Sequence, residues 1–168
     1  MSTTLADIHD FLDQRRIALV GVSRDPKDFS RMLFREMCKR GYDMVPVNPA
    51  ASELESRRCF AGIRDINPPA DGVLVMTSPQ ETEGVVQDCI EVGIRRVWMY
   101  RAAGQGAVNE KAAELCHEKG ITLVKGYCPY MFLPRTPFFH RVHGLLLKLS
   151  GGYPKASLPT AAAGAGKR

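Results

Sequence analysis

Short apolar runs rich in β-branched residues alternate along the chain with longer stretches in which apolar residues recur every three or four positions. The short runs have the length of buried strands, and the spacing in the longer stretches is that of amphipathic helices. Strands are predicted at Ile17–Val22, Met44–Asn48, Gly72–Thr77, Arg96–Tyr100 and Thr122–Lys125. Strands that alternate with helices in this way indicate a parallel sheet.

The stretches between these strands carry helix signals. Their apolar faces are expected at Phe29, Leu33 and Met37, at Val85, Val86, Cys89 and Ile90, and at Ala112, Leu115 and Cys116. Ser78-Pro79-Gln80-Glu81 has the form of a capping box at a helix start. Right-handed crossovers between the strands predict an α/β fold, a Rossmann-like doubly wound parallel five-stranded sheet with strand order 3-2-1-4-5.

Both ends of the chain are expected to add to this single domain. Residues 1–15 should form an N-terminal helix packed on the domain, with Leu5, Ile8, Phe11 and Leu12 inward. The domain itself is assigned to residues 16–150, and it includes an extra C-terminal helix at about 138–149 that either docks on the sheet or makes a homodimer contact. Residues 151–168 are rich in Ala, Gly and Pro and are predicted to form a flexible tail.

Composition places the chain among ordinary soluble proteins. It has 168 residues, of which 45% are hydrophobic and 24% charged, and no apolar run approaches the length of a membrane span. We therefore expect a cytoplasmic protein that does not associate with a membrane. The five cysteines are scattered without a C-x-x-C pair, so neither a disulfide framework nor a zinc site is indicated.

A formal net charge of +5 favours an anionic partner, whether a phosphorylated cofactor, an acidic protein or a nucleic acid. The pairs Arg57-Arg58 and Arg95-Arg96 are too dispersed for a nucleic-acid stripe, and no stacking aromatics alternate with them. Nucleic acid is therefore disfavoured.

Ligands of open α/β sheets bind at the carboxyl ends of the strands, where the strand order reverses. Two loops are predicted to meet there, residues 21–30 and residues 77–79. The first leads into a helix whose N-terminal amides suit a phosphate, and it supplies a turn glycine, two hydroxyls and three cations: Gly21, Ser23, Ser30, Arg24, Lys27 and Arg31. A plain βα turn, with Ser30 as the helix cap and solvated basic residues, fits the same loop.

A nicotinamide dinucleotide site is the main alternative for these loops. Such a site usually has the pattern G-x-G-x-x-G and an acid at the end of the second strand. Here only the first glycine, Gly21, is kept, and the second strand ends in Val45-Pro46-Val47-Asn48-Pro49 without an acid. Both departures disfavour NAD.

The chain resembles the CoA-binding domain proteins, relatives of the N-terminal domain of the succinyl-CoA synthetase alpha subunit. The segments that carry the resemblance are Val20–Ser23 with Ser30, Val45–Pro49, Asp71–Pro79, Val97–Met99 and Gly106–Glu110. It implies coenzyme A or acyl-CoA as ligand, with the pyrophosphate against Gly21, Val22, Ser23 and Ser30. It also implies the adenosine beside Val47, Asn48 and Pro49, and a crevice lined by Thr77, Ser78 and Pro79. Arg24 is expected to contact the phosphates.

The resemblance supplies no catalyst, because the phosphorylated histidine of the synthetase belongs to a second domain to which nothing here corresponds. We therefore expect a CoA-binding module without turnover, regulatory or a partner of an acyl-CoA enzyme. A nicotinamide-dependent oxidoreductase, a small acyl-CoA enzyme and a basic adaptor protein are the alternatives. Cys128 follows the last strand and is either a thiol that forms a mixed disulfide with CoA or a packing residue.

Overall fold

The computed structural model describes residues 2–101, 104–133 and 154. The helices are α1 (Leu5–Leu12), α2 (Phe29–Lys39), α3 (Pro79–Glu91) and α4 (Glu110–Glu118). The strands are β1 (Arg16–Val20), β2 (Asp43–Val47), β3 (Glu53–Leu54), β4 (Arg57–Arg58), β5 (Gly72–Val75), β6 (Arg96–Tyr100) and β7 (Thr122–Tyr127). Short 3-10 turns are η1 (Ile63–Asp65) and η2 (Pro129–Met131). The predicted helix at 138–149 and its dimer contact lie outside the described residues, as does the predicted tail except for Pro154.

The predicted five-stranded parallel sheet is confirmed, but its predicted strand order is wrong. The order is β2-β1-β5-β6-β7, so the five strands follow the sequence 2-1-3-4-5. The reason lies beyond β2, where Phe60 N–H donates to Pro46 O at 3.0 Å and Asn48 N–H donates to Phe60 O at 2.9 Å. This segment, which follows the β3–β4 hairpin, occupies the outer edge of β2, so the third strand crosses back to the other side of β1.

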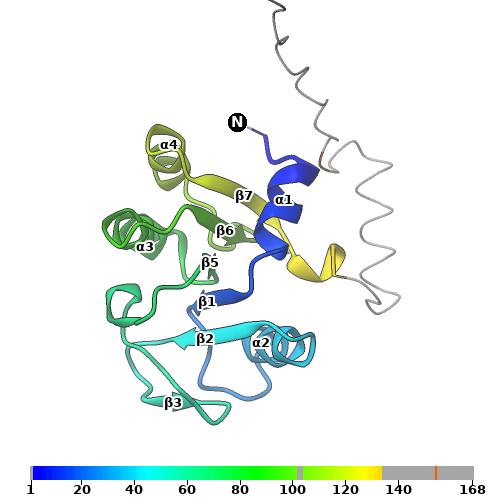
Figure 1. The fold of residues 1–168 in the computed structure, drawn as a ribbon, viewed down its shortest axis with the longest axis vertical. Coiled ribbons are helices and arrows are strands. Elements are labelled where there is room, and N and C mark those ends of the chain that lie inside the picture. Colours follow the sequence, from blue (N-terminus) through cyan, green and yellow to red (C-terminus); the bar gives the residue numbers. More distant parts are fainter. Residues whose placement is uncertain (1, 102–103, 134–153, 155–168) are drawn as a thin grey trace, which may run out of the picture.

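Two layers of helices cover the sheet, with α1 and α2 on one face and α3 and α4 on the other (Figure 1). The alternation along β1 divides its side chains between two cores: Ile17 and Leu19 belong to the α1–α2 side, and Ala18 and Val20 to the α3–α4 side. All four are buried, which explains why the strand is a continuous apolar run. Strand order then places the reversal of the sheet between β1 and β5.

The predicted N-terminal helix is shorter than residues 1–15, because it begins after Thr4 and ends at Leu12. The Thr4 side chain accepts from the Asp7 backbone N–H, and Asp7 in turn accepts from the Thr4 N–H, which closes a capping box. Phe11 is buried and meets Trp98 of β6 edge to face, with ring centroids 5.3 Å apart. This contact fastens α1 to the sheet.

The N-terminal caps of α3 and α2 lie next to the loops predicted for the site. The predicted capping box of Ser78 and Glu81 is confirmed at the start of α3. At α2, however, the cap is Asp28 and not Ser30, which is the second residue of the helix. No helix in the described part of the chain is long and apolar enough to cross a membrane.

Candidate functional site: a cleft where the strand order reverses

A cleft of about 390 Å³ opens at the carboxyl ends of β2, β1 and β5. Five residues predicted for the ligand site line it: Gly21, Val47, Asn48, Pro49 and Thr77. The cleft thus lies where the two predicted loops meet. They meet because β5, the third strand, lies next to β1, whereas the predicted order put the fourth strand there. The other six predicted residues, Val22, Ser23, Arg24, Ser30, Ser78 and Pro79, do not line it.

Gly21 brings the β1 and β5 ends together. Its φ is +88°, a left-handed conformation that side chains resist, and its N–H donates to Val47 O at 3.0 Å. A Cβ at this position would stand 2.9 Å from the carbonyl carbon of Met76 and 2.9 Å from the Thr77 nitrogen. The glycine is therefore required by the neighbouring backbone, apart from any ligand.

Ser30 is committed to the loop that precedes α2. Its side chain is buried, its oxygen accepts from Ser23 N–H at 2.8 Å, and its hydroxyl donates to the Asp28 carboxylate. Asp28 also accepts from the Ser30 N–H at 2.7 Å. A carboxylate thus already accepts from one of the amides at the start of α2, where the resemblance placed the pyrophosphate.

Arg31, one of the three predicted cations, also has a structural role. Its buried guanidinium donates to Glu55 and to the carbonyl oxygens of Ser23 and Arg24, at 3.2 and 3.3 Å. Burial pushes the Glu55 pKa up, but hydrogen bonds from Arg31 and Arg35 outweigh it and lower the pKa below its usual value. The ion pair ties the β3–β4 hairpin to the loop.

The remaining two cations of the loop, Arg24 and Lys27, have exposed side chains. Val22, in contrast, is fully buried, and the Ser23 hydroxyl accepts from Asp25 N–H at 3.1 Å. Of the three cations that the sequence predicted to contact phosphate, Arg24 and Lys27 are therefore the two that are exposed to solvent.

Asn48 connects the first loop to the end of β2. Its amide nitrogen donates to Val22 O at 2.8 Å, and its amide oxygen accepts from Ala50 N–H at 2.8 Å. Both ends of the amide are therefore engaged within the protein. Asn48 and Pro49 still form part of the cleft wall.

The third predicted segment contributes one wall residue and two residues of a helix start. Thr77 lines the cleft, and its buried Oγ1 is without a hydrogen-bond partner among the described residues. Ser78 and Pro79 begin α3, where Asn109 donates to Pro79 O at 2.8 Å and buried Thr82 donates to Ala107 O at 2.8 Å. The segment preceding α4 thus holds the start of α3 in place.

Sequence reasoning missed the far wall of the cleft, which consists of Ala61, Gly62 and Ile63 after the hairpin and Glu81, Val85 and Asp88 on α3. Positions 81, 85 and 88 share one helix face, a spacing that could have identified them. Glu81 accepts from the Ser78 hydroxyl, and Asp88 accepts from Arg64 at 2.8 Å. The charged residues that line the cleft are therefore carboxylates.

Cys128 emerges at the carboxyl edge, as predicted, but it is buried, and burial raises the pKa of its thiol to about 11. A thiol of this pKa is almost entirely protonated at neutral pH, which favours its role as a packing residue. Cys59, Cys89 and Cys116 are buried as well, as expected for small core residues.

The fold and the cleft together define a doubly wound α/β protein of one domain, with a ligand-sized recess at its topological switch point. Residues 15–134 match the family described as CoA binding domain, and the chain belongs to that family.

Several known proteins are similar to this chain in sequence or in structure. The uncharacterized protein YneT of Bacillus subtilis is 33% identical over 124 residues, which are 73% of this chain and 89% of YneT. A hypothetical protein from Pyrococcus horikoshii has a similar structure, with a TM-score of 0.69, 29% identity and coverage of 75% of this chain and 87% of that one. The alpha subunit of ADP-forming acetate–CoA ligase II from Pyrococcus furiosus is 23% identical over 70% of this chain, but the match covers only 27% of that subunit.

Proposed function

We propose that this protein binds coenzyme A or an acyl-CoA in the cleft between β2, β1 and β5 and carries out no turnover by itself. The observation that carries the proposal is the convergence of five predicted residues on one recess at the switch point, in a chain of the CoA binding domain family. A recess of about 390 Å³ has the size of a small-molecule site.

The charges around the cleft determine which end of the ligand lies inside it. The Glu81 carboxylate repels phosphates from the cleft, where Asp88 is paired with Arg64, whereas exposed Arg24 and Lys27 on the adjoining loop attract them. The adenosine then occupies the recess beside Asn48 and Pro49, and the pyrophosphate runs outward over residues 22–27. The Thr77 hydroxyl has no hydrogen-bond partner among the described residues, which supports a polar ligand group beside it in the recess.

The proposal of a role without turnover is supported by how small a part of the ligase subunit this chain matches. The alpha subunit of acetate–CoA ligase is nearly four times as long as the matched part, so ligase chemistry would require further protein. A regulatory role or partnership with an acyl-CoA enzyme accords with this. A cytoplasmic location and the absence of nucleic-acid binding remain predictions.

Calorimetric titration of the protein with CoA, acetyl-CoA, NAD, NADP and ATP tests the proposal. One-site binding of CoA, with NAD and ATP at least about tenfold weaker, a difference of about 1.4 kcal/mol, is the expected result. Binding of NAD or NADP without CoA would turn the assignment to the nicotinamide alternative.

A matched pair of variants locates the site. Ala61→Phe fills the recess from its rim and should abolish CoA binding, while Gln87→Phe, exposed on α3 outside the recess, should leave it unchanged. Equal CoA affinity in both folded variants would exclude this cleft.

A further inference from the structure

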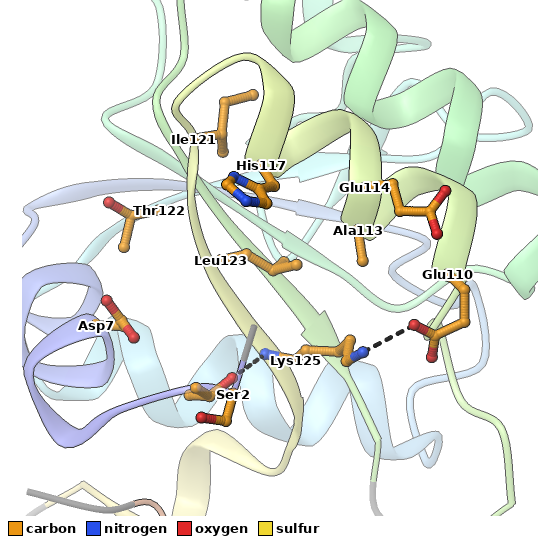
Figure 2. A pocket seen from close by; sticks show the side chains of 11 residues that line it. Ser2, Asp7, Glu110, Ala113, Glu114, His117, Ile121, Thr122, Leu123 and Lys125 are labelled. Atoms are coloured by element: carbon orange, nitrogen blue, oxygen red, sulfur yellow. Dashed lines mark hydrogen bonds and ion pairs between the residues drawn. The ribbon is translucent and has the colours of Figure 1, made fainter.

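A second recess, of about 280 Å³, lies along the opposite end of the sheet, beside β7 (Figure 2). One wall is a single face of α4, formed by Glu110, Ala113, Glu114 and His117, and the other is the outer side of β7, with Thr122, Leu123 and Lys125. Ser2, Thr3 and Asp7 close one end. We call this recess the β7 groove; it shares no residue with the cleft.

The edge of β7 presents backbone groups to the groove. Thr122 N–H donates to Arg95 O on the β6 side at 2.9 Å, and neighbouring peptide groups of a strand point in alternate directions. The peptide groups of Leu123 and Lys125 therefore face away from the sheet. Thr3 Oγ1 accepts from the Lys125 N–H at 2.8 Å, which confirms this direction. Since β7 is last in the sheet, Leu123 has no strand to pair with among the described residues.

The charge of the groove selects the kind of partner. Its wall holds three carboxylates, of Asp7, Glu110 and Glu114, and one ammonium, of Lys125, which pairs with Glu110 at 2.9 Å. Asp7 and Glu114 then have no ion-pair partner among the described residues. On a chain of net charge +5 this is a local acidic surface. A second copy paired edge to edge would bring like carboxylates together, which disfavours self-association here.

We propose that the β7 groove is a docking surface for an extended, basic segment of a partner protein, which adds as a strand to β7 and places a Lys or Arg side chain against Glu114. Main-chain hydrogen bonds to Leu123 supply affinity, and the carboxylates select basic residues at alternate positions. A segment bound here leaves the cleft open, so the proposal does not depend on the assignment of CoA.

Titration of the isotopically labelled full chain with the peptide acetyl-Val-Lys-Val-Lys-Val-amide, followed by amide NMR spectra, tests the proposal. Saturable shifts centred on Leu123 and Lys125 are expected. The same peptide with N-methylated backbone amides retains its charge but loses its donors, and should bind at least about fivefold more weakly. Equal binding of the two peptides, shifts centred elsewhere, or no saturable binding at millimolar peptide would overturn the proposal.

Two variants on the same helix provide the protein-side control. Glu114→Lys should weaken peptide binding at least about fivefold, while Glu118→Lys, exposed on α4 outside the groove, should change it by less than about twofold. Both variants should retain the CoA affinity of the parent chain. Loss of peptide affinity to the same extent in both would show that overall charge, not the groove, attracts the peptide.

Discussion

The loop that leads into α2 and the cleft beside it were both predicted to contact the ligand, yet their buried polar groups differ in one respect. In the loop, Ser30 and Arg31 direct their hydrogen bonds to the protein itself. In the cleft, Asn48 also bonds within the protein, but Thr77 leaves a buried hydroxyl without a partner among the described residues. A residue of the right type at the right position can therefore shape a site without touching its ligand.

Gly21→Val should have the largest effect on stability, because it places a β-branched side chain at φ +88° and against the Met76–Thr77 backbone. We expect a loss of about 3 to 5 kcal/mol in the free energy of unfolding, measured by urea denaturation. Gly41→Val is the matched control: φ is +92° there, but no atom lies within 4 Å of the added Cβ. Equal losses in both variants would mean that conformational strain alone acts at Gly21.

Asn48 distinguishes a positioning residue from a ligand contact. Asn48→Ala leaves the Val22 carbonyl and the Ala50 N–H without their partner, which should cost about 2 kcal/mol and lower CoA affinity. Asn48→Asp retains the acceptor for Ala50, but it removes the donor to Val22 and adds a third carboxylate to the cleft, so it should lower CoA affinity at least as much as alanine does. A fall in affinity with unchanged stability would instead indicate direct contact with the ligand.

Glu55 tests whether the hairpin supports the loop. Glu55→Gln should lower the unfolding free energy by about 1 to 2 kcal/mol at neutral pH, because it removes the charge that Arg31 and Arg35 contact. The folded-state pKa of Glu55 is below its unfolded value, so its contribution is present above about pH 4.3 and is lost as the pH falls through the folded value. The variant should therefore lose less stability on acidification than the parent. Glu53→Gln, exposed on β3, should follow the parent chain.

The sequence predicts the sheet well where a residue's neighbours along the chain determine its state. The apolar run of β1 and the capping box at Ser78 are of this kind. The strand order is not, because it depends on Phe60 pairing with the outer edge of β2. The hairpin has strands of two residues each, and its turn residues Glu55 and Ser56 have positive φ without the glycine or asparagine that usually marks such a turn.

The candidate site follows the same division. Its location was predictable, because parallel strands bring their carboxyl ends to one edge and Gly21, Asn48 and Thr77 lie there. The direction of each hydrogen bond was not, because it depends on partners distant in the sequence: Glu55 lies 24 residues from Arg31, and Val22 lies 26 residues from Asn48. Glu81 and Asp88 were not predicted as site residues because they lie on α3, beyond the loop that follows β5.

Arg24→Ala should have the smallest effect on stability and yet lower CoA affinity several-fold. The exposed side chain should contribute less than about 0.5 kcal/mol to folding, whereas a charged contact with a phosphate weakens with salt. Calorimetry at two salt concentrations should therefore show a smaller salt dependence of CoA binding in the variant than in the parent. Lys39→Ala, exposed at the far end of α2, controls for net charge. If the two variants bind CoA equally well, the phosphates do not run over residues 22–27, and the division between a structural Arg31 and a ligand-facing Arg24 fails.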